Sequence, residues 1–205
     1  MSKKNCTILL FLCLGCLTVC AGGLILDPDC DKPELGEMSI TEGNRQGTLT
    51  DFAEEQNGNR CRKLEIRQYK TDAEGRRSIN LCIRIGGGKN LHGFPCEPNT
   101  RYSFSLEIKG SASRAMINFY EWDDAAKTGY GNRKKGKTSI HLIHPQKEWT
   151  VYRGTFKTGP TAKRAALCVQ FWGDEKHKDL PEKPGDHVLI DKIRIEKEAS
   201  HSNAQ

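Results

Sequence analysis

The stretch from Glu97 to Asp123 constrains the fold more than any other part of the 205-residue chain. Apolar and polar side chains alternate along residues 102–109. After a polar turn at 110–113, a second alternation along residues 115–122 places Ala115, Ile117 and Phe119 on one face. A period of two residues is typical of a β-strand that buries one of its faces. We therefore expect a hairpin of two strands whose apolar faces belong to one core.

The second of these strands carries unusual side chains on the face that should meet water. Phe119 and its inward neighbours fit a core, but the opposite face presents Met116, Asn118, Tyr120 and Trp122. Tyr and Trp rings stack on the apolar C–H faces of sugars, and amide groups form hydrogen bonds with sugar hydroxyls. A solvent-facing aromatic stripe beside polar side chains therefore indicates a sheet that binds carbohydrate.

Alternation of the same kind recurs through the rest of the chain, separated by polar turns. Further strands are expected near residues 62–69, 78–85, 149–157, 165–172 and 187–196, and no convincing amphipathic helix occurs. Many short strands with polar turns predict an all-β, antiparallel β-sandwich. We expect this domain at residues 46–197, after a spacer or loose N-terminal edge at 22–45 and before a disordered tail at 198–205.

Residues 1–21 have the pattern of a signal peptide. Lys3 and Lys4 precede an apolar run at residues 7–19, and small residues follow around Cys20. Such a run is too short to span a bilayer comfortably, as in an export signal. The same residues also fit, imperfectly, the lipid-attachment signal of a lipoprotein. We expect an exported protein, secreted or held at the cell surface, whose only contact with membrane would be a lipid anchor.

The nine cysteines agree with an exported protein, and four of them belong to the leader. The remaining five are Cys30, Cys61, Cys82, Cys96 and Cys168. They contain no C-x-x-C spacing, so they do not predict a structural zinc site. Up to two disulfides could form among them, and the sequence leaves their pairing open.

Two other classes of function find little support in the sequence. The net charge is +6, but Lys and Arg are scattered, so no nucleic-acid partner is expected. Glu107 and Glu121 are a conceivable glycosidase pair, yet alternation places them on opposite faces of their strands. A glycosidase needs two carboxyl groups that face one cleft. We therefore expect a non-catalytic protein.

Three motifs carry a resemblance to a known family. They are Pro98-Asn99-Thr100 followed by Tyr102-Ser103-Phe104-Ser105, Trp149-Thr150-Val151-Tyr152 followed by Thr155-Phe156, and Val188-Leu189-Ile190-Asp191-Lys192-Ile193. Their order and spacing resemble the second half of a carbohydrate-binding module of the family 4/9 type, a jelly roll of the galactose-binding-like superfamily. The motifs cover residues 97–196, and residues 45–96 agree only in strand pattern. The resemblance implies a concave sheet that binds glycan and often a structural calcium ion far from it.

The outward positions of the strands supply a candidate site for a polysaccharide or glycan. We expect the carbohydrate-binding residues to be Tyr120, Trp122, Trp172, Asn118, Gln170, Arg153 and Glu107. In the alternative interpretation, Tyr120 and Trp122 lie beneath the long loop at 123–137 or against a protein partner. The protein would then be a structural or protein-interaction module at the cell surface.

Asp191 is the one candidate metal ligand. Alternation places it inward between Leu189 and Ile193, where a carboxylate without a partner would be costly. Either backbone N–H groups or a cation must satisfy it. In the family that the chain resembles, an acidic residue at this place often helps to hold calcium, so calcium is the expected cofactor if one is present.

Overall fold

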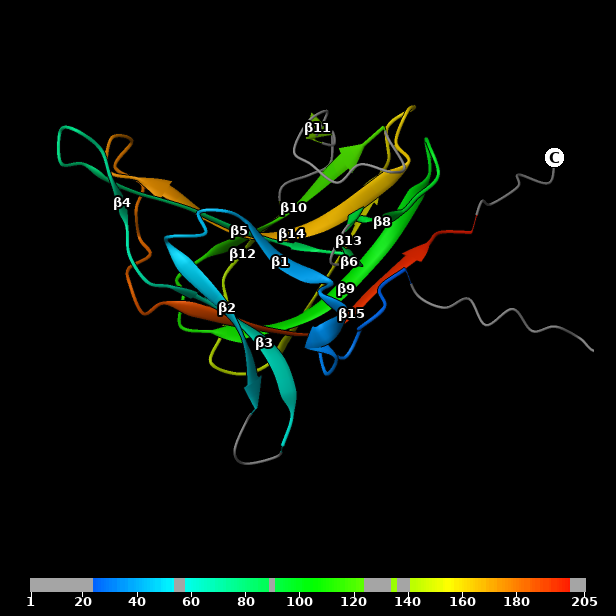
Figure 1. Ribbon diagram of the computed structural model, residues 1–205, viewed down its shortest axis with the longest axis horizontal. Helices are drawn as coiled ribbons and strands as arrows, with labels where there is room; N and C mark the ends of the chain where they lie inside the picture. The colour runs from blue at the N-terminus through cyan, green and yellow to red at the C-terminus, as the bar shows by residue number, and fades with distance from the viewer. Residues whose placement is uncertain (1–23, 54–57, 89–90, 124–133, 136–140, 200–205) are drawn as a thin grey trace, which may run out of the picture.

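The computed structural model describes residues 24–53, 58–88, 91–123, 134–135 and 141–199. It is a sandwich of two antiparallel sheets (Figure 1). Sheet A has the order β1 (Met38–Glu42), β5 (Arg77–Ile85), β14 (Arg164–Asp174), β10 (Ala115–Trp122) and β11 (Lys134–Lys135). Three short strands join it: β4 (Lys70–Thr71) on β5, β8 (Phe94–Pro95) on β14 and β12 (His141–Ile143) on β10.

Sheet B has the order β13 (Thr150–Lys157), β9 (Arg101–Gly110), β15 (His187–Lys197), β3 (Arg60–Ile66) and β2 (Gly47–Ala53). In Figure 1, β5, β10 and β14 of sheet A lie above β2, β3 and β15 of sheet B. A small ladder of β6 (Gly87–Gly88) and β7 (Leu91–His92) and one 3-10 turn, η1 (Pro33–Leu35), complete the described elements. Among the described residues there is no α-helix, so the predicted all-β antiparallel sandwich is confirmed.

The core lies between the sheets and is built from the inward half of each alternating run. Ile117 and Phe119 on β10 and Val169 and Phe171 on β14 all belong to it, as their alternation predicts. The Phe119 ring stacks on Phe156 of sheet B, with ring centroids 3.9 Å apart. Contacts of this kind join the two sheets across the core, because each aromatic ring buries a large apolar area.

The expected hairpin of residues 102–122 is not formed. β9 pairs with β13 and β15 in sheet B, whereas β10 pairs with β14 and β12 in sheet A. The turn between them therefore crosses from one sheet to the other, and Ala112 within this turn is buried in the core. The backbone N–H groups of Ser111 and Ala112 donate to the His187 carbonyl oxygen at the start of β15 (3.1 and 3.3 Å).

The sandwich begins before the predicted boundary at residue 46. β1 pairs with β5 at the edge of sheet A, so residues 38–42 are part of the domain. The segment 24–37 is also attached to the domain, because Ile25 and Cys30 are buried. Of the two expectations for residues 22–45, the described residues agree with an N-terminal edge better than with a spacer. The Ile193 backbone N–H donates to the Pro28 carbonyl (2.7 Å), and the Glu37 carboxylate accepts the Leu26 N–H (2.9 Å).

The predictions for the two ends of the chain fall mostly on residues that the structure does not describe. The expected signal peptide at 1–21 and positions 200–205 of the expected tail lie outside the described residues. Within the part of the chain that the structure describes, no helix is long and apolar enough to cross a membrane.

No disulfide joins the five cysteines of residues 24–199, all of which are described. Cys82 on β5 and Cys168 on β14 share one face of sheet A, but Cys82 lies opposite Gln170 and Cys168 opposite Arg84. They are therefore diagonal neighbours, about 7–8 Å apart in an antiparallel ladder. That separation exceeds the usual Cα span of a disulfide.

Candidate carbohydrate-binding face

The register of sheet A gathers most of the predicted site on one surface, which we call the outer face of sheet A. In the β10–β14 ladder, Met116 lies opposite Gln170 and Tyr120 opposite Ala166. Side chains two residues apart on a strand point the same way. The outer face therefore includes the predicted residues Asn118, Tyr120 and Trp122 of β10 and Gln170 and Trp172 of β14.

Three amide side chains form a hydrogen-bonded row across this face. Asn118 Nδ2 donates to Gln170 Oε1 (2.8 Å), and Gln170 Nε2 donates to Asn80 Oδ1 (2.7 Å). Asn118 and Gln170 are buried, whereas Asn80 on β5 is exposed. The row fixes the orientation of the Asn80 amide, so its nitrogen faces away from Gln170 as a hydrogen-bond donor. Asn80 is missing from the predicted site, although its outward alternation on β5 was a signal for it.

Trp172 is the predicted aromatic residue that remains open on this face, with 42% of its surface exposed. It lies directly opposite Asn80 in the β14–β5 ladder. Arg114 supports the end of its strand: Nη2 donates to the Trp172 carbonyl oxygen at 3.1 Å. The same guanidinium contacts Asp179 (2.7 Å) and Glu182 (3.2 Å). Trp172 is therefore exposed on a well-supported backbone.

Glu182 is itself buried within this support. Burial raises the pKa of its carboxyl group, and the neighbouring Arg114 guanidinium and Ser113 hydroxyl only partly oppose that shift. Ser113 Oγ donates to Glu182 Oε1 at 3.3 Å. The Glu182–Arg114 pair is thus a structural element beside Trp172, and it is not open to ligand.

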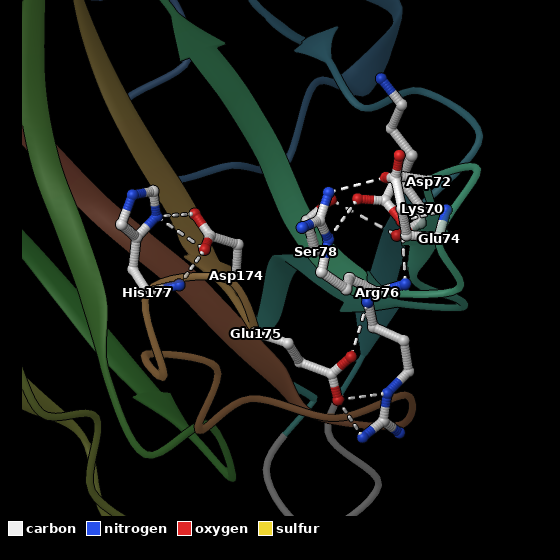
Figure 2. A network of polar contacts seen from close by, with 9 residues as sticks. Lys70, Asp72, Glu74, Arg76, Ser78, Asp174, Glu175 and His177 are labelled. Carbon is white, nitrogen blue, oxygen red and sulfur yellow. Dashed lines mark hydrogen bonds and ion pairs between the residues drawn. The ribbon is translucent and has the colours of Figure 1, made fainter.

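A polar network borders the same end of the face, as Figure 2 shows. Asp174, two residues beyond Trp172, accepts from His177 Nδ1 at 2.7 Å, and this contact lowers the pKa of the Asp174 carboxyl group. Glu175 accepts from the backbone N–H and the guanidinium of Arg77 at the start of β5. These contacts attach the turn after β14 to the β4–β5 hairpin, next to Trp172.

The expectation that Tyr120 and Trp122 face solvent is wrong. They are only 8% and 3% exposed, and with Cys82, Ala166 and Cys168 they form a second apolar cluster on the outer face of sheet A. Gly93 lies so close that a Cβ placed there would be 3.1 Å from Trp122 Cζ3. The predicted cover at residues 123–137 falls mostly outside the described residues. This end of the face is covered by the protein itself.

Arg153 and Glu107 do not join the other predicted site residues. Arg153 is on β13 and Glu107 on β9, so both lie on the outer surface of sheet B, across the core from Trp172. Glu107 forms an ion pair with Lys192, whose Nζ lies 2.9 Å from Oε2. Alternation identified both residues as outward-facing, but it could not tell which of the two sheets would carry them.

The prediction that Asp191 points into the core is also wrong, because β15 contains a bulge. Asp191 lies opposite Glu107 of β9 and Arg194 lies opposite Ser105, so β15 has one residue more than β9 between these pairs. A bulge of one residue exchanges the faces of the strand. Asp191 therefore shares the outward side of sheet B with Leu189, and it is buried there, with 1% exposed.

Protein donors satisfy the Asp191 carboxylate. Asn59 Nδ2 donates to Oδ2 at 2.9 Å, and the Lys192 backbone N–H donates to Oδ1 at 2.7 Å. Burial nevertheless raises the pKa of this carboxyl group. Among the described residues, no group of three or more His, Cys, Asp or Glu side chains is placed to hold a metal ion. The described residues around Asp191 therefore do not fit the expected calcium ion.

Comparison with known proteins identifies the fold of the chain but assigns the chain to no sequence family. No family model matches the chain, and no curated protein matches it. Among solved structures, a CBM4 carbohydrate-binding module is similar over 85% of this chain and 99% of its own length, with a TM-score of 0.53 and 9% identity.

Two larger proteins show the same likeness over part of their length. One is the CBM22-1–GH10 portion of a Clostridium thermocellum endo-1,4-β-D-xylanase in complex with xylohexaose, with a TM-score of 0.52 and 13% identity. The other is the enzymatically active domain of tailspike protein 4 of bacteriophage CBA120, with a TM-score of 0.54 and 10% identity. The likeness covers 86% of this chain in both cases, but it spans only 29% and 21% of those chains. The chain therefore has the jelly-roll β-sandwich fold of carbohydrate-binding modules.

Proposed function

We propose that the protein is an exported, non-catalytic carbohydrate-binding module that binds glycan at the open end of the outer face of sheet A. The observation that carries this proposal is the exposed indole of Trp172 opposite Asn80, whose amide is held by Gln170. The site is thus smaller than the predicted one, and it is centred on Trp172 in place of Tyr120 and Trp122.

The chemistry of this surface suits a sugar ring. The indole offers an apolar face for stacking on C–H groups, and the Asn80 amide nitrogen can donate to a hydroxyl group. Met116, half-buried opposite Gln170, and Leu142, 54% exposed opposite Met116, continue the apolar surface across β10 and β12. A glycan longer than one ring could therefore extend from Trp172 toward β12.

The arrangement of carboxylates supports a non-catalytic role. Glu107 is on sheet B in an ion pair with Lys192, whereas Glu121 is buried on sheet A and accepts the Gly159 backbone N–H (3.1 Å). Hydrolysis of a glycosidic bond needs two carboxyl groups that face one cleft. The one pair that the sequence suggests lies on different sheets.

Replacing Trp172 by alanine should weaken glycan binding with little effect on stability. Loss of a stacking side chain costs on the order of 1–3 kcal/mol of binding free energy, or roughly a ten- to hundredfold rise in Kd. A glycan array on the wild-type domain would identify a ligand, and titration calorimetry would then compare the variants. Trp149→Ala is the matched control, because Trp149 precedes β13 of sheet B, where the Lys109 ammonium lies over its ring, 5.5 Å from the centroid.

An unchanged Kd for Trp172→Ala would contradict the proposed site. A wild-type protein that binds no glycan on the array would contradict the proposed function. The exposed Trp172 and Leu142 would then favour the alternative, a protein-interaction module at the cell surface.

Export is part of the proposal and is supported by the pattern of residues 1–21. The mature protein should lack this leader, or it should begin at Cys20 with a lipid on that cysteine. Mass spectrometry of the protein recovered from its natural host would measure the N-terminus. An intact Met1 in the mature species would contradict both forms of the prediction.

A further inference from the structure

The outer face of sheet B carries a depression that the proposed glycan site does not use. It is an open hollow with a volume of about 280 Å³, and its lining comes from the three adjacent strands β13, β9 and β15. The polar side chains in the lining are Ser103, Ser105, Arg153, Arg194 and Glu196. Arg153, which the sequence indicated as a ligand-binding residue, therefore lies in a hollow of its own on the opposite side of the molecule from Trp172.

The register of sheet B brings two arginines to either side of one serine. Arg153 of β13 lies opposite Ser105 of β9, and Ser105 lies opposite Arg194 of β15. Neighbouring strands are about 4.8 Å apart, so the two arginine backbones are separated by only about 10 Å across β9. Both guanidinium groups can therefore reach a single group seated over the Ser105 hydroxyl.

The two arginines differ in whether their charge is already paired with a carboxylate of the protein. Arg153 is exposed and makes no ion pair with any described residue. The Arg194 side chain is 44% exposed; its Nη2 is in an ion pair with Asp29 (2.9 Å) and its Nη1 donates to the Ile193 carbonyl oxygen (3.0 Å). Arg153 therefore supplies the main free charge of the depression, and Arg194 adds its remaining N–H donors. A planar guanidinium matches the two oxygens of a carboxylate, which it can bind with two parallel hydrogen bonds.

A second row of side chains, centred on Ser103, restricts the ligands that the depression can bind. Glu196 of β15 lies opposite Ser103, and Thr155 of β13 lies opposite Ser103 on the other side. A carboxylate can only accept hydrogen bonds, so Glu196 favours hydroxyl donors and repels a second negative group. The depression therefore favours a small molecule that has one anionic end and hydroxyl groups beside it.

We propose that this depression binds a uronic acid residue of an acidic glycan. The sugar carboxylate lies over Ser105 between Arg153 and Arg194, and the ring hydroxyls face Ser103 and Glu196. The inference does not depend on the proposed glycan site, because the two surfaces belong to different sheets. It adds an acidic-sugar ligand on sheet B to the glycan that we propose for the outer face of sheet A.

The test compares tri-galacturonate with its fully methyl-esterified form, which has the same rings without charge. The wild-type protein should bind the acid and lose most of that binding with the ester. Arg153→Gln should raise the Kd for the acid roughly ten- to a hundredfold, because a hydrogen bond to a charged group is lost. Arg153→Lys, which keeps the charge without the fork, should give an intermediate value.

Lys157→Gln is the matched control, because Lys157 is an exposed cation on the same face of β13, opposite Arg101. It should leave the Kd unchanged, and an equal loss in both glutamine variants would reveal diffuse charge attraction and overturn the inference. Equal binding of acid and ester would also overturn it. Sodium sulfate that competes as strongly as galacturonate would also overturn the inference, because the depression would then bind oxyanions in general.

Trp172→Ala separates this inference from the proposed function. Acid binding should survive in that variant, since Trp172 lies on the other sheet. If Trp172→Ala abolishes it, the acidic glycan binds at sheet A, and the proposed function stands while this inference fails. If Arg153→Gln abolishes acid binding and no glycan responds to Trp172→Ala, the inference stands while the proposed site fails.

Discussion

Replacing Trp122 by alanine should lower the free energy of unfolding by about 3–5 kcal/mol, the range for removing a buried aromatic side chain. Trp122 is 3% exposed in an apolar cluster with Tyr120 and Cys168, and Gly93 lies against its ring. The neighbouring backbone cannot close the resulting space without moving Gly93, which has a left-handed φ of 73°. The cavity would therefore remain and add to the loss of buried area.

Urea unfolding followed by circular dichroism would measure this change, because tryptophan fluorescence itself is altered by the substitution. Trp172→Ala is the internal comparison: it removes the same side chain from the same face, where 42% of it is exposed. A Trp122→Ala protein as stable as the Trp172→Ala protein would show that Trp122 is open to solvent. In that case the carbohydrate-binding site predicted from the sequence, with Tyr120 and Trp122 as its stacking residues, would regain its support.

Replacing Phe119 by alanine should also lower the free energy of unfolding by about 3–5 kcal/mol. Phe119 lies on the face of β10 opposite to Trp122, in the core between the two sheets. The Phe119 ring contacts two aromatic rings of sheet B: Phe156, with centroids 3.9 Å apart, and Phe104, at 5.2 Å. Truncation removes the contacts between sheets at this point of the core. The substitution should lower the urea concentration at the midpoint of unfolding and leave the dependence of the unfolding free energy on urea concentration unchanged.

Leu142→Ala is a suitable control for the core prediction. Leu142 belongs to β12 of the same sheet but is 54% exposed on the outer face, so its truncation should change stability by no more than about 0.5 kcal/mol. Equal effects of the two substitutions would mean that Phe119 does not lie between the sheets. The inward alternation of residues 115–122 would then be incorrect.

The alternation of the strands was predictable from sequence because the pleat of a strand is a local property. Ile117 and Phe119 were assigned to the core and Asn118 to the outer face from residue types alone, and the structure agrees. The all-β class followed from the same periodicity together with the polar turns. Whether the outer face binds glycan, and whether the chain is exported, stay predictions.

The exposure of Tyr120 and Trp122 was not predictable in this way. Alternation tells which side of a strand a residue is on, but not what covers that side. Their cover includes Gly93, almost thirty residues earlier in the chain, and Cys168, more than forty residues later. Burial on the outer face is thus decided by contacts between distant segments, which leave no periodic signal in the strand itself.

In strands without a bulge, such as β10 and β14, the sequence by itself determined which side chains face outward, since that choice follows from the backbone geometry of a few consecutive residues. Only the tertiary structure decided that Arg153 and Trp172 lie on opposite sheets, because strand pairing joins residues far apart in the chain. It also decided the side of Asp191, because the bulge in β15 depends on its register with β9. One extra residue in that ladder reverses a face, and no pattern within β15 alone reveals it.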